Sequence, residues 1–178
     1  MTPMAQTSPN EARPVHEETR TKVLRLLMVV LPIVILDQTT KALVVRMLHP
    51  FEVVPVIPGF FNITLAYNQG GAFSLAAESA TWVRALLFFG LSVAAACLVL
   101  YLYVKTPARE RWFSFALLLV LAGAFGNLTD RFRLGAVVDF IQLYAGTWYW
   151  PSFNVADSAV STGVGILVVL FLLKKDPF

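Results

Sequence analysis

The chain has 178 residues, of which 57% are hydrophobic and only 14% are charged, and its formal net charge is +3. This apolar fraction exceeds what a soluble domain of this size can bury, so much of the surface must face lipid. One cysteine excludes an internal disulfide, and two separated histidines disfavour a zinc site or a Ser/His triad. We therefore expect no metal and no other cofactor.

Residues 1–22 are polar, contain prolines and have few apolar residues, so we expect a mobile cytoplasmic tail there. Four apolar segments follow, and each is long enough to cross a bilayer at about 1.5 Å per helical residue. The predicted transmembrane helices are 23–45, 82–104, 112–132 and 155–173. The first one has the basic flank of a secretory signal peptide but no small-residue cleavage site, which favours an uncleaved helix.

Residues 50–78 contain too many prolines and glycines for a membrane helix. The runs FEVVPVI and FFNITLAY are typical of strands, and they can pair around the Pro58-Gly59 turn as a small sheet on the membrane surface. Asn68 with Gly70 indicates either a plain turn or a bend where the backbone approaches another group closely.

Lysine and arginine near the ends of the spans predict the topology. Eight lie on one side: Arg20, Lys22, Arg25, Lys105, Arg109, Arg111, Lys174 and Lys175. Four lie on the other: Arg46, Arg84, Arg131 and Arg133. Both termini should therefore be cytoplasmic, with the sheet on the outer face. This placement of basic residues fits membrane topology and does not favour nucleic-acid binding.

Polar residues gather between 123 and 157, beside the third and fourth spans. They are Asn127, Asp130, Arg131, Asp139, Asn154 and Asp157. The first three share one side of the third helix, and the last two face together at the start of the fourth. Ionisable groups at such depths are costly, so they indicate a functional site.

Asp37 and Lys41 lie four residues apart near the end of the first span, in the order that favours an ion pair. Two interpretations remain open. The pair either marks a helix end whose lysine reaches the membrane interface, or points inward and braces a polar site.

Asp139 and Asp157 have contrasting surroundings. The dipole at the start of the fourth helix favours a carboxylate at Asp157, whereas apolar neighbours should raise the pKa of Asp139. Two acids with separated proton affinities suit aspartyl protease chemistry. Alternatively, Asp157 is only a helix cap and Asp139 a surface acid. A proton-coupled transporter and a non-enzymatic assembly factor are the competing functions.

Five sequence blocks in order resemble lipoprotein signal peptidase, the type II signal peptidase of bacteria. They are DQTTK (37–41), YNQGGAF (67–73), GNLTDR (126–131), VVDF (137–140) and FNVAD (153–157). The resemblance implies that Asp139 and Asp157 are catalytic. It also implies that Asn127, Asp130, Arg131 and Asn154 support the pair or the substrate. Asp37 and Lys41 would brace the site, and Asn68 with Gly70 would face the substrate.

The same resemblance implies a mainly α membrane protein with one domain over 23–178. Four transmembrane helices would carry a small extracytoplasmic antiparallel β-sheet and a short periplasmic-side helix or flap at 140–152. The implied substrate is a diacylglyceryl-modified prolipoprotein, cut on the amino side of its lipidated cysteine. We expect a multi-pass monomer in the lipid of the bacterial cytoplasmic membrane, with its active site at the outer face.

Overall fold

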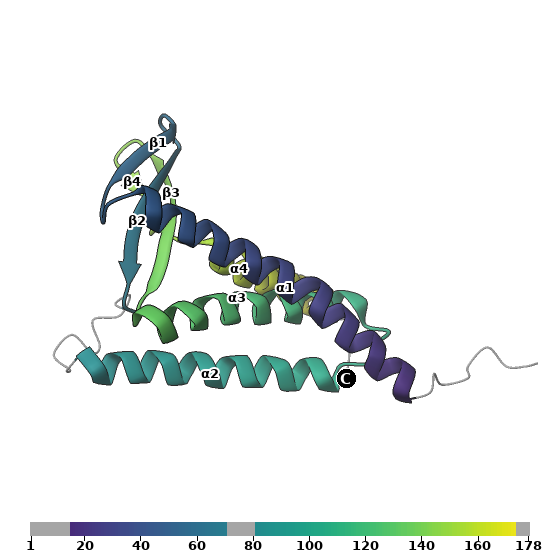
Figure 1. Ribbon diagram of the computed structural model, residues 1–178. Coiled ribbons are helices and arrows are strands. Elements are labelled where there is room, and N and C mark those ends of the chain that lie inside the picture. The colour runs from purple at the N-terminus through teal and green to yellow at the C-terminus, as the bar shows by residue number, and fades with distance from the viewer. Residues whose placement is uncertain (1–14, 71–80, 174–178) are drawn as a thin grey trace, which may run out of the picture.

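The structure, a computed structural model, describes residues 15–70 and 81–173. In these residues four long helices carry a small sheet at one end (Figure 1). The helices are α1 (Val15–Met47), α2 (Thr81–Lys105), α3 (Arg111–Leu134) and α4 (Val155–Leu172). All four are long and apolar enough to cross a membrane.

The bounds of α2, α3 and α4 fall within two residues of the spans expected from hydropathy. The start of α1 is different, because residues 15–22, expected in the tail, are helical. Glu17 and Glu18 in its first turn favour a helix start through the helix dipole. Glu18 also accepts a hydrogen bond from Ala108 N at 3.0 Å, so the α2–α3 loop holds this turn in place. The rest of the expected tail, residues 1–14, lies outside the described residues.

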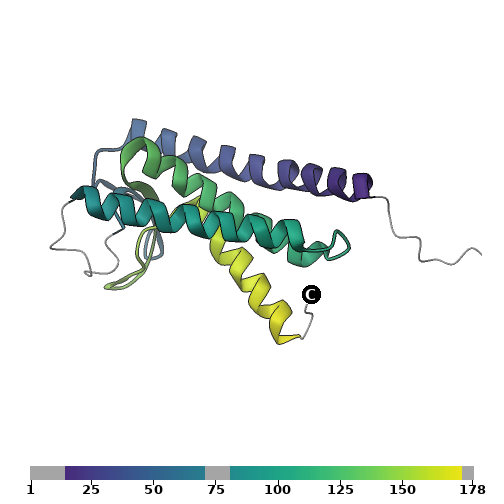
Figure 2. The same ribbon diagram turned by 90° about the horizontal axis from the view of Figure 1, so that it is seen from below.

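Helix α3 is the centre of the bundle and contacts each of the other three helices. Figure 2 shows it running between α1 and α2, with α4 crossing obliquely beneath. About half of the residues in the apolar stretch of α3 are buried in the protein, whereas few residues in the apolar stretches of the other three helices are buried. Its side chains Leu117, Leu118 and Leu121 form the core with Val30 of α1 and Ala96 of α2. Because α3 is enclosed, polar groups at its end can be shielded from both water and lipid.

Glycine permits the close approach of α3 and α4. A Cβ atom on Gly123 would collide with the backbone oxygen of Ala156 and lie 2.6 Å from Val160 Cγ2. We therefore expect Gly123→Ala to lower the free energy of unfolding by about 1–3 kcal/mol, as overpacking commonly does. Thermal unfolding in detergent measures the effect. Gly165→Ala is the control, since a Cβ there meets no described atom within 4 Å. Equal melting temperatures for both variants would contradict this packing argument.

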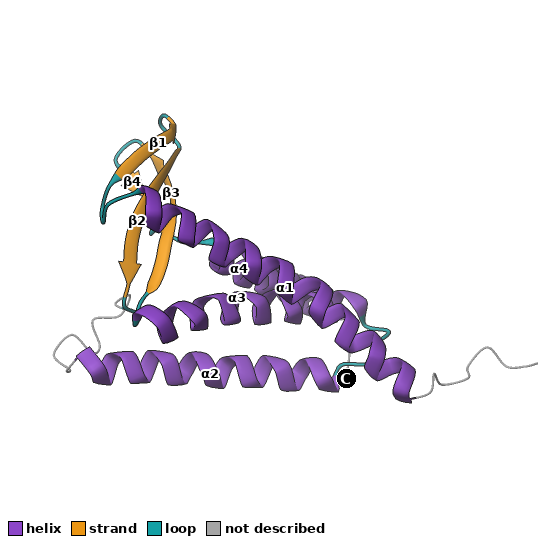
Figure 3. Ribbon diagram, viewed as in Figure 1, coloured by secondary structure: helices purple, strands orange, loops and turns teal. Residues whose placement is uncertain are grey.

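The sheet lies at the end of the bundle where α1 and α3 finish (Figure 3). Its strands are β1 (Val53–Ile57), β2 (Phe61–Asn68), β3 (Val137–Ala145) and β4 (Trp148–Tyr149), antiparallel in the order β1-β2-β3-β4. The hairpin expected around Pro58-Gly59 is confirmed as β1–β2. Residues 71–78, expected to extend this cradle, lie outside the described part.

The segment 140–152, expected as a helix or a flap, contains no helix. Most of it belongs to the β3–β4 hairpin, which turns at Gly146 with a φ of 60°. Its β-branched and aromatic residues favour a strand, and β2 supplies the partner that the sequence did not reveal. Asp139 thus lies on a paired strand and not in an open connection.

Both described ends of the chain lie at the end of the bundle remote from the sheet (Figure 1). A chain that crosses a membrane an even number of times has both ends on the same side. The sheet and the polar ends of α3 and α4 therefore share the opposite end.

Candidate active site

A tight reversal after α3 brings Asp139 back towards the end of that helix. Gly135 has a φ of 69°, which an L side chain adopts with strain, and its N–H donates to Arg131 O at 3.0 Å. The chain then enters β3, where Val138 N donates to Asp130 Oδ2 at 3.1 Å. This short path joins the polar end of α3 to the strand that carries Asp139.

Asn154 connects the two aspartates that the sequence singled out. Its Nδ2 donates to Asp139 Oδ1 at 2.8 Å, and its backbone N donates to Asp157 Oδ2 at 3.2 Å. Asp157 N in turn donates to Asn154 Oδ1 at 2.9 Å, which completes a capping box at the start of α4. Asp139 and Asp157 are thus hydrogen-bonded to the same residue, which holds the two carboxylates near each other.

Asp157 caps α4 and also makes a contact with a second helix. Its Oδ1 accepts a hydrogen bond from Asn127 Nδ2 on α3 at 2.7 Å, while Oδ2 serves the capping box. The side chain is half-buried. The helix cap therefore also fixes this carboxylate at the junction of α3 and α4.

Asp139 is only 3% exposed, so its interpretation as a surface acid is wrong. Burial raises the pKa of Asp139 to about 6. The hydrogen bond that Asn68 Nδ2 donates at 3.0 Å lowers the pKa of Asp139. The negative charge of Asp157 raises this pKa, and the hydrogen bond from Asn154 lowers it. Asp139 therefore retains a proton more readily than an exposed aspartate, in the direction that its apolar neighbours predicted.

A buried ion-pair triad lies beneath the two aspartates. Lys41 Nζ lies 2.8 Å from Asp37 Oδ2 and 2.8 Å from Asp130 Oδ2. All three side chains are at most 3% exposed, so the inward interpretation of Asp37 and Lys41 is confirmed. Asp37 Oδ1 also accepts from Ala156 N at 2.9 Å, which ties α1 to the first turn of α4.

The triad also orients an amide of the site. Lys41 Nζ donates to Asn127 Oδ1 at 3.1 Å, so the Nδ2 group of Asn127 is the one that faces Asp157. An acceptor at that position would repel the carboxylate. The charge on Lys41 thus acts on Asp157 through Asn127.

Arg131 is half-buried on α3, and its positive charge interacts with the carboxylates of Asp157, Asp139 and Asp130. Such a cation offsets the repulsion between the acids, because like charges in a shielded place repel strongly. All ten residues predicted for the site lie in the described part of the chain, and the structure brings nine side chains together. Gly70 contributes backbone.

Asn68 and Gly70 form a bend at the end of β2. Gly70 N donates to Asn68 Oδ1 at 2.9 Å, which leaves Nδ2 for Asp139. Gly70 has a φ of 84°, and a Cβ there would lie 2.6 Å from Phe88 Cδ2 of α2. The bend is therefore also a close approach, which was the second of the two interpretations.

Gln38 is a site residue that the sequence reasoning missed. Its Nε2 donates to Asp37 Oδ2 at 3.2 Å, to Gly126 O at 3.1 Å and to Asp130 Oδ1 at 3.0 Å. Arg133 Nη1 lies 3.4 Å from Gln38 Oε1. Its place beside Asp37 within the DQTTK block was the available signal.

Amides and cations satisfy these carboxylates, and no three acidic, His or Cys side chains of the described residues form a group able to hold a metal ion. The site contains two linked aspartates, one buried and one half-buried, at the end of a membrane-sized bundle. Such a pair can share a proton and activate a water molecule.

The comparisons with known proteins agree on one family. The family model for signal peptidase (SPase) II matches residues 29–173. A lipoprotein signal peptidase of Desulforapulum autotrophicum is 46% identical over 155 residues, covering 87% of this chain and 96% of that protein. One of Syntrophus aciditrophicus is 43% identical over 143 residues, covering 80% and 89%.

The fold has a match among solved structures. A bacterial membrane enzyme determined by the in meso method at 2.3 Å resolution superposes with a TM-score of 0.72 at 29% identity. The match covers 88% of this chain and 90% of that one. With the family match, these similarities show that the chain belongs to the signal peptidase II family, as its five sequence blocks predicted.

Proposed function

We propose that the protein is a membrane aspartyl endopeptidase that removes the signal peptide from diacylglyceryl-modified prolipoproteins. It cuts on the amino side of the lipidated cysteine, and Asp139 and Asp157 are its catalytic residues. The observation that carries this proposal is the joining of both aspartates through Asn154 at one end of the bundle. The names of the relatives supply the substrate class.

The reaction follows from the protonation of the pair. The ionised aspartate takes a proton from a water molecule, whose oxygen attacks the scissile carbonyl carbon, while the protonated aspartate donates a hydrogen bond to the carbonyl oxygen. The tetrahedral intermediate then collapses, the C–N bond breaks, and the leaving amine takes up the proton that the first aspartate accepted from water. The burial of Asp139 supports the presence of a shared proton, and the pair titrates as a unit.

The position of the site suits a lipidated substrate. The apolar signal helix and the diacylglycerol remain in the bilayer, while the peptide bond reaches the pair at the end of α3. Exposed Trp148, Tyr149 and Trp150 lie on or beside the β3–β4 hairpin, and such aromatic residues suit the headgroup layer. These features support lipid contact around the substrate.

The proposed topology puts both termini in the cytoplasm and the site at the outer face of the bacterial cytoplasmic membrane. The count of lysine and arginine supports it, as does the position of both described chain ends opposite the sheet. A single chain supplies every residue of the site, which supports action as a monomer.

The proposal is tested by incubating purified enzyme with a diacylglyceryl-modified precursor and with its unlipidated counterpart. Mass spectrometry of the released signal peptide should show cleavage of the lipidated precursor only, with cysteine as the new amino terminus. A chelator should leave the rate unchanged. Equal cleavage of both precursors would contradict the substrate assignment, and cleavage of neither would contradict the peptidase.

The raised pKa of Asp139 predicts the pH dependence of activity. The pair needs one proton, so kcat/KM should fall as the pH rises through the upper apparent pKa of the free enzyme, at about 6. It should fall again at acidic pH, when both aspartates are protonated. Measuring kcat/KM across both limbs tests this bell shape, with circular dichroism as a check on folding. Glu110→Gln should leave the profile unchanged, and a flat profile for the parent enzyme would argue against a shared proton.

A further inference from the structure

A second site lies at the other end of the bundle, between α1 and α3. It is a groove with a volume of about 610 Å³, lined by Arg25, Val29, Arg111, Trp112, Phe115 and Leu118. Arg111 begins α3 and lies 16 residues before Asn127, which is roughly 24 Å along a helix axis. The groove is therefore separate from the site that contains the aspartates.

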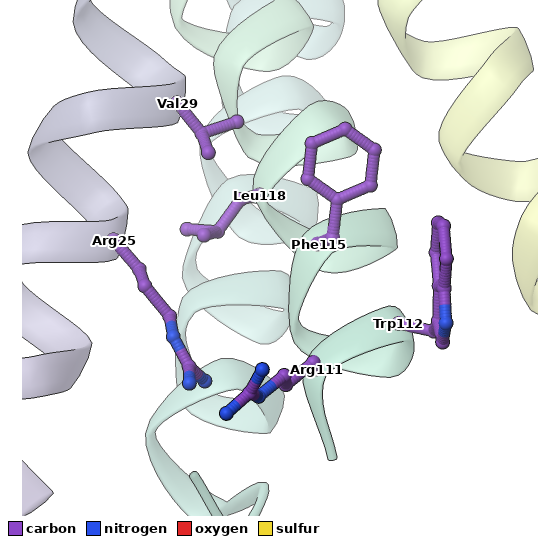
Figure 4. Close-up of a pocket in the computed structure, with 6 residues that line it drawn as sticks. All are labelled: Arg25, Val29, Arg111, Trp112, Phe115 and Leu118. Atoms are coloured by element: carbon purple, nitrogen blue, oxygen red, sulfur yellow. The ribbon is translucent and has the colours of Figure 1, made fainter. Parts of the chain in front are cut away.

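The guanidinium groups of Arg25 and Arg111 point toward one another at one end of the groove (Figure 4). Arg25 Nη1 donates to Ala108 O at 2.6 Å, so the α2–α3 loop holds this side chain in position. An arginine has five N–H donors, and Arg25 retains others for a ligand. Two cations that point into the same end of a groove repel each other, and an anion between them would relieve this repulsion.

Glu18 and Glu110, two described acids near this end of the bundle, interact with other groups. Glu110 Oε1 lies 3.5 Å from Arg109 Nε, and Glu18 Oε1 lies 3.5 Å from Lys22 Nζ and accepts from Ala108 N. Glu110 does not cap α3 with its side chain, so the positive end of the helix dipole adds to the basic character of this end. The charge of the groove thus favours a ligand with a net negative charge.

The remaining wall is apolar. Val29, Phe115 and Leu118 extend from the guanidinium groups along the helices, and Trp112 lies at the edge facing α4 (Figure 4). Trp112 is 68% exposed, as is typical of tryptophan at a membrane interface. A charged end followed by an apolar wall matches a phospholipid, whose phosphate lies at the interface and whose acyl chains lie deeper.

We propose that this groove binds one anionic phospholipid. Its phosphate lies between Arg25 and Arg111, and an acyl chain packs along Val29, Phe115 and Leu118. A zwitterionic lipid carries a cation beside the phosphate, which the two arginines disfavour. In the proposed topology this lipid belongs to the cytoplasmic leaflet, although the binding itself depends on neither the topology nor the peptidase reaction.

Native mass spectrometry of the purified, full-length protein tests the site, with phosphatidylglycerol and phosphatidylcholine titrated separately. We expect one tightly bound phosphatidylglycerol and weaker phosphatidylcholine binding. Each arginine should contribute a factor of about five, so that Arg111→Gln weakens the first binding step about fivefold and the double variant with Arg25→Gln about 25-fold. Arg109→Gln, a neighbouring arginine that does not line the groove, is the matched control and should bind as the parent does.

Arg111→Gln is the decisive variant, because Arg25→Gln also removes the hydrogen bond to Ala108 O and can disturb the α2–α3 loop. Thermal unfolding should show that Arg111→Gln is folded, and cleavage of the lipidated precursor in detergent should be unchanged. Equal affinity for the two lipids, or equal losses for Arg111→Gln and Arg109→Gln, would overturn the proposal. Displacement of the lipid by inorganic phosphate at matched concentration would identify a simple phosphate site instead.

Discussion

Asp139→Asn and Asp157→Asn should each lower kcat for cleavage of a lipidated precursor by about 10³-fold or more. In the proposed mechanism each substitution removes one partner of the proton-sharing pair, and general acid–base catalysis commonly contributes 10²–10⁴-fold. Asparagine is nearly isosteric with aspartate, so a loss of this size reports on chemistry more than on packing. Single-turnover cleavage of a diacylglyceryl-modified precursor measures it.

A double variant sharpens this test. Residues that act as one unit lose activity non-additively, so Asp139→Asn/Asp157→Asn should be no slower than either single variant. Glu110→Gln is the control for loss of one negative charge, since this residue lies at the remote end of α3. Normal turnover in either single variant, with the parent's melting temperature, would remove that aspartate from the mechanism.

Lys41→Met should lower the free energy of unfolding more than Gly123→Ala does. The substitution leaves Asp37 and Asp130 buried without their shared cation, and breaking a buried pair commonly costs about 3–5 kcal/mol. It also removes the bond that orients Asn127 towards Asp157. The melting temperature in detergent and the cleavage rate of the folded fraction should therefore both fall.

Lys22→Met is the matched control on the same helix. Lys22 Nζ donates to Val104 O at 2.9 Å and pairs with Glu18, whose side chain is 39% exposed, so water can replace much of this ion pair. Its melting temperature should fall much less, and its cleavage rate should be close to that of the parent. Comparable melting temperatures for the two lysine variants would show that the triad does not stabilise the bundle.

The triad of Asp37, Lys41 and Asp130 both stabilises the fold and positions the two elements that carry the aspartates. Asp37 holds the first turn of α4 through Ala156, and Asp130 holds the start of β3 through Val138. These two elements carry Asp157 and Asp139. The triad therefore fixes the separation of the two aspartates, although it touches neither of them directly in the described structure.

Hydropathy alone located most of the fold. Spans of about 20 apolar residues predict α2, α3 and α4, because a bilayer imposes a minimum length on a helix. The β1–β2 hairpin was also predictable from local chemistry, since proline and glycine define its turn. The early start of α1 was not, because its first turns are polar and are held by the α2–α3 loop.

The amino-acid sequence by itself determined the membrane class, the four crossings, the family and the residue types of the site, because these depend on composition, spacing and ordered blocks. Only the tertiary structure decided that Asp37 and Lys41 point inward, that VVDF is a strand against β2, and that Asn154 joins Asp139 to Asp157. The physical reason is distance along the chain. Lys41 and Asp130 are 89 residues apart in sequence yet 2.8 Å apart in space, and no local pattern encodes such a contact.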